Sequence, residues 1–190
     1  MPADVSAYLV LLILVALERI LELRISKKNQ RKLGSRGVEK VREPNFVGMV
    51  IMHTGVLISA GAEVYFLHRP LIRPLAVAAG GMFLFATILR WWVIRTMADH
   101  WNVQVMASVE IGVVSTGPYE WIRHPNYLAV ILELASLPLI HTAWITAIWA
   151  TAANAWILKS RLSAEDAMLM SNTEYRNVMG AKPRFIPRFF

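Results

Sequence analysis

The sequence predicts an all-α integral membrane protein, a single membrane domain over residues 1–190 with about five transmembrane helices. Its composition is 56% hydrophobic with a mean hydropathy of +0.44, which is too apolar for a soluble domain of this size. The apolar residues are grouped into runs long enough to cross a bilayer, and most lysines and arginines lie between these runs. These three observations favour a helical bundle in the membrane over a soluble fold.

The apolar runs define five expected spans. They are residues 5–25, 46–67, 71–94, 126–138 and 142–158. A perpendicular helix needs roughly 20 apolar residues to cross the hydrocarbon core, and the first three segments reach that length. The last two share a shorter stretch that Pro138 and His141 interrupt, so they form either a tight hairpin or one long kinked helix. We favour the hairpin, because a single helix of that length would overshoot the bilayer.

The distribution of basic residues predicts the topology. With five spans, 16 of the 20 lysines and arginines lie on one face, whereas only Arg69 and Arg73 lie on the other. By the positive-inside rule the face with 16 is cytoplasmic, which places the N-terminus outside. Asp4 stands where a signal peptide would be basic, so we interpret the first segment as a retained span.

Composition also excludes several functions. The net charge is +7, and the basic residues lie between the apolar runs, so we expect them to contact anionic lipids. No basic stretch is interleaved with aromatic residues that could stack on bases, so we do not expect nucleic-acid binding. The chain has no cysteine, which excludes a disulfide framework, a cysteine zinc site and a cysteine nucleophile. Neither a zinc-binding histidine spacing nor a nucleotide-binding glycine motif occurs, and we expect no metal.

The segment between the third and fourth spans, residues 97–125, is too long for a simple turn and is expected to be a functional cytoplasmic loop. It ends in the sequence Gly117-Pro118-Tyr119-Glu120-Trp121-Ile122-Arg123-His124-Pro125-Asn126-Tyr127. Each proline fixes its own φ and biases the residue before it toward an extended shape, and Pro125 can begin the fourth span. Arg123, His124 and Tyr127 therefore gather at a helix N-terminus, which suits a carboxylate or phosphate. The alternative is a basic, aromatic interfacial anchor.

The tail, residues 160–190, is polar and amphipathic, and we expect it to continue the fifth span as a cytoplasmic helix that breaks at Gly180 and Pro183. Arg161 and Glu165 lie one helical turn apart. Taken alone, this spacing favours a surface ion pair. The functional alternative is that both side chains close over the loop and orient ligand groups.

Ionisable residues also lie inside the expected spans, where they are costly and usually face a cavity or a partner. They include Glu22, Arg90 and Glu133, with His53 as a weaker candidate. Arg90 is expected to pair with Glu133 or with Glu22. The alternative applies to Glu18 and Glu63, which lie near the interface and can extend toward water.

At this point the sequence resembles a known family. The pattern from Gly117 to Tyr127, a hairpin, and then Arg161, Glu165 and Tyr175-Arg176 is similar to the isoprenylcysteine carboxyl methyltransferase family, over roughly residues 85 to 190. Those are integral membrane enzymes that use S-adenosyl-L-methionine. The N-terminal pattern, from Glu18-Arg19 through Asn29, resembles a bacterial branch that methylates hydroxyls of long-chain polyketides such as alkylresorcinols and alkylpyrones. This resemblance implies a bacterial inner or plasma membrane, with the active site facing the cytoplasm.

The resemblance implies a methyltransferase acting on an oxygen, a carboxylate or a phenolic hydroxyl, of a lipophilic or prenylated substrate in the membrane. It implies that His124 and Tyr127 contact the cofactor and that Tyr119 and Pro125 shape its pocket, and we also expect Gln104 among the cofactor-binding residues. Catalytic roles fall to Arg161, which would orient the nucleophilic oxygen, and to Glu165, which would position it or take a phenolic proton. The residues expected to bind substrate are Glu22, Arg90 and Glu133. The chain departs from the bacterial proteins at Asn102 and Gln104, where they carry Thr or Ser and Arg.

Two other functions fit parts of the pattern. Membrane sterol- or steroid-type reductases that use NADPH have a similar Arg-His-Pro-Asn-Tyr stretch, but they are usually longer, and the Arg161 and Glu165 pair favours the methyltransferase. The third possibility is a non-enzymatic lipid-binding membrane protein. The sequence leaves the substrate and the oligomeric state open.

Overall fold

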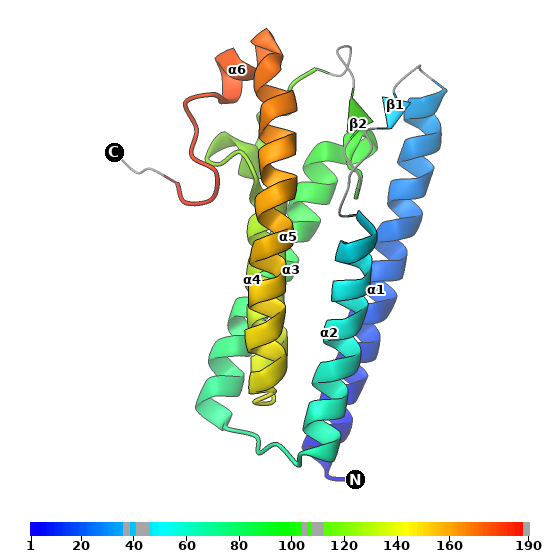
Figure 1. The fold of residues 1–190 in the computed structure, drawn as a ribbon, viewed down its shortest axis with the longest axis vertical. Helices are drawn as coiled ribbons and strands as arrows, with labels where there is room; N and C mark the ends of the chain where they lie inside the picture. Colours follow the sequence, from blue (N-terminus) through cyan, green and yellow to red (C-terminus); the bar gives the residue numbers. More distant parts are fainter. Residues whose placement is uncertain (36–38, 41–45, 104–105, 108–111, 188–190) are drawn as a thin grey trace.

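The fold is a bundle of five long helices, seen in a computed structural model that describes residues 1–35, 39–40, 46–103, 106–107 and 112–187. Successive helices run in opposite directions along the long axis (Figure 1). The long helices are α1 (Ala3–Gly34), α2 (Phe46–Phe66), α3 (Arg73–Met97), α4 (Pro125–Leu139) and α5 (Trp144–Ser171). The expected all-helical membrane fold is confirmed, apart from one antiparallel pair of two-residue strands, β1 (Glu39–Lys40) and β2 (Met106–Ala107).

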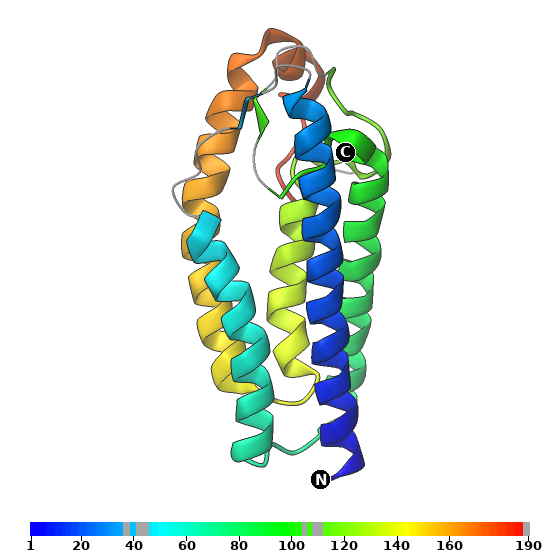
Figure 2. The ribbon, with the colours of Figure 1, turned by 90° about the vertical axis from the view of Figure 1, so that its right-hand side faces the viewer.

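The two ends of the bundle differ. At the end that we call the turn end, the N-terminus lies beside the α2–α3 link and the α4–α5 turn (Figures 1 and 2). The other end, which we call the loop end, carries the 3-10 helices η1 (Ala98–His100) and η2 (Gly117–Glu120) and the short helix α6 (Thr173–Met179). The predicted cofactor contacts Tyr119, His124, Pro125 and Tyr127 belong to the loop end or to the start of α4.

Helix boundaries differ from the expected spans in informative ways. α1 continues to Gly34, well beyond the apolar segment, because its later turns are held by contacts with the loop instead of by lipid-facing apolar surface. α4 and α5 are separate helices that form a hairpin, with Thr142 at a positive φ of 54° in the turn. The expectation of one helix running from the fifth span to Gly180 is wrong. α5 ends at Ser171 because Asn172 adopts an extended backbone, and its side chain accepts a hydrogen bond from Tyr175 N to begin α6.

Packing at the turn end joins α1 directly to α2. Gly61 lies where a Cβ atom would come within 3.3 Å of both Leu9 and Leu12, so the two helices approach closely there. Tyr8 donates a hydrogen bond to the carbonyl of Leu137 at 3.0 Å and ties α1 to α4 as well. From this contact α2 diverges from α1 toward the loop end (Figure 2).

The outer surface of the bundle suits hydrocarbon. Among the described residues, two helices are long and apolar enough to cross a membrane, Phe46–Phe66 and Arg73–His100, and Pro125–Leu139 is a shorter apolar helix. Large aliphatic side chains face outward on three helices, with Ile58, Val77 and Ile148 each about two-thirds exposed or more. Apolar exposure on this scale is typical of a surface that contacts lipid or a partner.

Candidate active site

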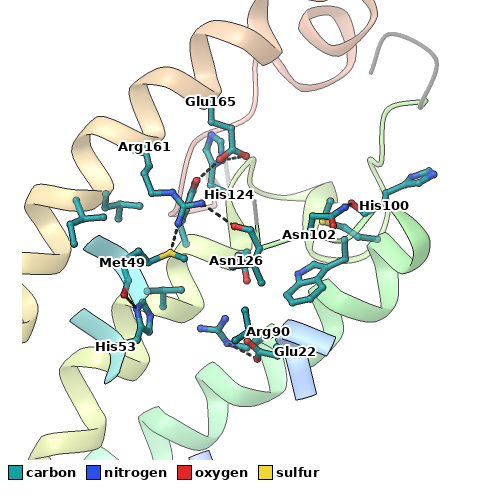
Figure 3. A pocket seen from close by; sticks show the side chains of 18 of the residues that line it. Glu22, Met49, His53, Arg90, His100, Asn102, His124, Asn126, Arg161 and Glu165 are labelled. Atoms are coloured by element: carbon teal, nitrogen blue, oxygen red, sulfur yellow. Dashed lines mark hydrogen bonds and ion pairs between the residues drawn. The ribbon is translucent and has the colours of Figure 1, made fainter. Parts of the chain in front are cut away.

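A cavity of about 740 Å³ runs from the loop end into the interior of the bundle (Figure 3). Its walls come from all five long helices and from the loop before α4. At the loop end it is lined by Tyr119, His124, Asn126, Tyr127, Arg161 and Glu165. Deeper in the bundle Glu22, His53 and Arg90 face it, among apolar side chains of α1 and α2. The fold thus gathers the polar candidates from both halves of the sequence around one space.

The loop is held against α3 through Gly117. This residue has a φ of 58°, and a Cβ atom there would lie 2.6 Å from Thr96 Oγ1 and 3.0 Å from Trp92 Nε1. Two residues later Tyr119 reaches the end of α3, where its hydroxyl donates to Met97 Sδ at 2.9 Å. Burial, and then the nearby charge of Glu165, raise the pKa of Tyr119 far above its usual value. Tyr119 is therefore a protonated donor on the cavity wall at any physiological pH.

His124 is oriented by an acid that the sequence patterns did not single out for this role. Its Nε2 donates to Asp166 Oδ1 at 2.7 Å, and the same carboxylate accepts from Arg184 Nε at 2.7 Å and Arg123 Nη1 at 3.4 Å. Burial favours protonation of Asp166, but the hydrogen bond from His124 and the arginine charges outweigh it, so the pKa of Asp166 is lowered.

Backbone bonds add to this connection between loop and tail. Arg123 N donates to Pro183 O at 2.9 Å, and His124 N donates to Arg184 O at 3.1 Å. The tail segment around residue 184 is thus fastened along the loop immediately before α4. The ionised Asp166 carboxylate and these two bonds together fix the loop end of the cavity.

Arg161 and Glu165 point into the cavity and not to an open surface (Figure 3). Glu165 accepts a hydrogen bond from the Tyr127 hydroxyl. Arg161 donates to the carbonyl of Val103 at 3.1 Å and contacts Met49 Sδ, and its guanidinium lies 5.8 Å from the centre of the Tyr127 ring. These contacts connect α5 with α2, α4 and the loop, so the two residues close one side of the cavity.

The charges inside the bundle form one cluster. Arg90 is ion-paired with both expected partners, Glu133 (Nε to Oε1, 2.9 Å) and Glu22 (Nε to Oε1, 3.5 Å). Arg19 approaches Glu22 at 3.2 Å and Glu133 at 3.4 Å, and also pairs with Glu18. Glu22 and Arg90 line the cavity, whereas Glu133 lies behind Arg90. Glu133 therefore acts on a ligand through Arg90 and Arg19, which both line the cavity.

Several polar groups at the cavity were missed by sequence reasoning. Asn126 Oδ1 and Trp101 Nε1 are buried and have no hydrogen-bond partner within the described part of the chain. Asn154 adds a polar side chain to the wall formed by α5. A signal existed for Asn126, since it lies in the first turn of the fourth span between two predicted contacts. Gln104, also a predicted cofactor contact, lies outside the described residues.

Comparisons with known proteins agree with this arrangement. A model of the isoprenylcysteine carboxyl methyltransferase (ICMT) family matches residues 79–171. The chain is 30% identical over 160 residues to the uncharacterized protein YpbQ of Bacillus subtilis, covering 84% of this chain and 94% of that protein. The chain belongs to the isoprenylcysteine carboxyl methyltransferase family. The resemblance seen in the sequence is thereby confirmed at the level of the family.

A solved structure shows the same fold. The eukaryotic intramembrane Ras methyltransferase ICMT superposes with a TM-score of 0.58 at 23% sequence identity, over 77% of this chain. The match spans 54% of that enzyme, so the present chain corresponds to about half of it. The ICMT family model itself covers most of α3, the loop, α4 and all of α5, which carry Arg90, His124 and Arg161. Glu22 and His53 are added by α1 and α2, outside the residues that this model matches.

Proposed function

We propose that this protein is an S-adenosyl-L-methionine-dependent methyltransferase that acts on an oxygen of a lipophilic substrate held in the membrane. The observation that carries the proposal is the single cavity, which joins a polar loop end to an apolar interior. A charged cofactor and a lipid need such opposite environments, and methyl transfer requires them to meet at one point.

The residues present fit S-adenosyl-L-methionine, which carries a carboxylate, an ammonium group and an adenosine. α4 begins at Pro125 without a side-chain N-cap, so its N-terminus would hold the carboxylate. Glu165 would face the ammonium group. Asn126 Oδ1 is an acceptor and Trp101 Nε1 is a donor, and both lack a hydrogen-bond partner within the described part of the chain. Adenosine would provide a donor and an acceptor for them. When bound, the cofactor supplies an electrophilic methyl group.

The chain's own residues then align the substrate and exclude water. Arg161 would orient the nucleophilic oxygen, while Glu165 is held in place by Tyr127. The apolar part of the substrate would lie along Ala16, Ile20, Leu23, Val50, Leu57 and Ile58. Ile20 and Ile58 are about half exposed or more, which supports a cavity wall that is open toward the lipid. A long apolar chain would extend there into the bilayer.

For the topology we propose five spans, with the loop and the tail on the cytoplasmic face of a bacterial inner or plasma membrane. The five antiparallel long helices support this proposal. So does the basic stretch at the loop end of α1, which includes Arg24, Lys27 and Lys28. The multi-pass arrangement would let the cofactor enter from the cytoplasm and the lipid from the side.

The first test is calorimetric titration of S-adenosylhomocysteine into the detergent-purified protein. We expect binding by the wild type, and a loss of at least roughly tenfold in His124→Ala, because the variant removes a cavity wall and a partner of Asp166. His68→Asn, an exposed change at the turn end, is the matched control and should bind like the wild type. Binding of NADPH in place of S-adenosylhomocysteine would instead indicate a reductase. Binding of neither cofactor would indicate a lipid-binding protein.

The second test addresses Arg161. In a screen of prenylated thiols with a free carboxylate and of long-chain phenols, Arg161→Ala should lower the methylation rate by about 10²- to 10³-fold, as for a lost electrostatic contact at the reacting atoms. An unchanged rate in this variant would remove Arg161 from the mechanism.

A further inference from the structure

His53 has an arrangement that its position in the sequence did not reveal. Its ring lies at the cavity, on α2, and Nδ1 is 2.9 Å from the carbonyl oxygen of Met49, one helical turn earlier (Figure 3). A carbonyl oxygen only accepts hydrogen bonds, so Nδ1 carries the hydrogen. In the neutral ring Nε2 is then the acceptor. Within the described part of the chain, no group donates to Nε2.

The carboxylates around the cavity are held in ion pairs or hydrogen bonds, although Glu22 Oε1 has no hydrogen-bond partner in the described part of the chain. Glu22 and Glu133 are paired with Arg90 and Arg19. Toward the loop end, Glu165 accepts from Tyr127. Among the described basic groups that line the deep half of the cavity, the imidazole of His53 differs from the carboxylates in that it forms no ion pair.

We propose that His53 Nε2 accepts the proton of a substrate hydroxyl during methyl transfer. The proposal rests on the proposed function and deepens it, because it assigns the base that Glu165 was expected to provide. The hydroxyl donates to Nε2 on binding. As its O–H bond breaks, the proton goes to Nε2 and an oxygen electron pair bonds the methyl carbon of the sulfonium donor. The pair of the broken carbon–sulfur bond stays on sulfur, so atoms and charges balance.

The charged groups that surround His53 come from four helices. Arg19 and Glu22 face it from α1, Arg90 from α3 and Glu133 from α4, while Arg161 lies toward the loop end beyond Met49. Glu22 and Glu133 share Arg90 and Arg19, so charges of both signs lie around the ring. Burial makes an imidazolium costly at this depth, so the ring rests neutral, with Nε2 as a hydrogen-bond acceptor.

The need for a proton acceptor discriminates between substrates. A carboxylate nucleophile arrives without a proton and needs no base. A hydroxyl enters neutral, donates one hydrogen bond and loses one proton. His53 thus matches a nucleophile that arrives protonated, which separates the two oxygen classes left open above.

Binding tests the acceptor without requiring turnover. The probes are 4-dodecylphenol and its methyl ether, which differ in the hydroxyl proton, titrated into the detergent-purified protein. The wild type should prefer the phenol by about fivefold, the effect of one hydrogen bond. His53→Phe keeps the ring but removes the acceptor, so it should lose the preference, whereas His53→Gln should keep it. Equal binding of the two probes by the wild type, or an undiminished preference in His53→Phe, would overturn the proposal.

Rates test the proton transfer. Since Gln accepts a hydrogen bond but is not a base, His53→Gln should methylate the phenol about 10²- to 10⁴-fold more slowly, and its rate should lose the wild-type decline on acidification. His68→Asn should keep both the rate and the pH profile. A wild-type methylation rate in His53→Gln would contradict the role of His53 as the base. S-adenosylhomocysteine binding is measured in the wild type and in every variant. If the wild type does not bind it, the methyltransferase proposal is wrong. If His53→Gln binds it normally, a loss of methylation in that variant is due to His53 and not to the cofactor site.

Discussion

Glu63 at the turn end and Arg90 at the cavity are both buried charged residues, and their surroundings are opposite in kind. Glu63 accepts hydrogen bonds from Ile145 N at 3.1 Å and from Thr146 N at 2.8 Å, and so caps α5, which has no N-cap of its own. Arg69 approaches the same carboxylate at 2.8 Å. Near Arg90, by contrast, the cavity wall includes buried polar atoms that lack partners, such as Asn126 Oδ1.

The same contrast holds for the packing of α1. At the turn end it is held by apolar contact with α2 around Gly61. At the loop end the Asn29 side chain fastens α1 to the loop, donating to Ala98 O at 3.0 Å and Trp101 O at 2.8 Å, while the cavity separates α1 from α2. A buried polar group that makes all its hydrogen bonds within the chain stabilises the fold. A buried polar group without a hydrogen-bond partner marks a place where a ligand can supply one.

The largest effect on this comparison is expected from removing one arginine at each end. Arg90→Met leaves Glu22 and Glu133 without their shared partner inside the bundle, which should lower the free energy of unfolding by about 3–5 kcal/mol. Arg69→Met is the matched variant: Glu63 keeps its backbone donors and Arg69 is partly exposed, so the loss should be about 0–1 kcal/mol. Unfolding in detergent, followed by circular dichroism, measures both.

Equal losses in the two arginine variants would show that the two clusters do not differ. Adding Glu133→Gln to Arg90→Met sharpens the test, because it removes one of the two carboxylates that are then left to share Arg19. The double variant should recover part of the stability if the cost comes from unpaired charge.

An intermediate effect is expected at Gly117, where the loop meets α3. Gly117→Ala puts a Cβ atom against Thr96 Oγ1 in a left-handed backbone, which should cost about 2 kcal/mol and weaken S-adenosylhomocysteine binding by displacing Tyr119. Gly48→Ala on α2 meets nothing within 4 Å and should leave stability and binding unchanged or slightly improved. If both variants bind like the wild type, the loop is not positioned through this contact.

Much of the architecture could be predicted because the constraints that fix it are local or severe. Apolar run length sets the long helices, and Pro138 with His141 marked the α4–α5 turn. The pairing of Arg90 followed from the cost of a lone charge in a membrane, which leaves few partners. Resemblance of the loop and tail motifs then led to the family, which the comparisons confirm.

What the sequence did not reveal depends on tertiary contact. The open face of His53 exists because α2 diverges from α1, and no periodicity states which turn of a helix lines a cavity. The connection from Asp166 to His124 and Arg184 joins three separate segments. The end of α5 at Ser171 depends on the backbone of Asn172, which helix propensity alone weakly constrains.

The smallest expected effect concerns the Asp166 connection and its response to pH. Because the pKa of Asp166 is lowered in the folded protein, its contribution to stability is complete above about pH 4, where an unfolded aspartate ionises, and is lost as the pH falls through the folded value. Asp166→Asn keeps an acceptor for His124 but loses the charge, so it should cost about 1 kcal/mol at neutral pH and nearly nothing in strong acid. The difference between wild-type and variant melting temperatures, measured from pH 3 to pH 7, should therefore narrow on acidification. A difference that is constant with pH would mean that Asp166 holds the tail by shape and not by charge, and the loop end would then resemble the turn end more closely than the contacts indicate.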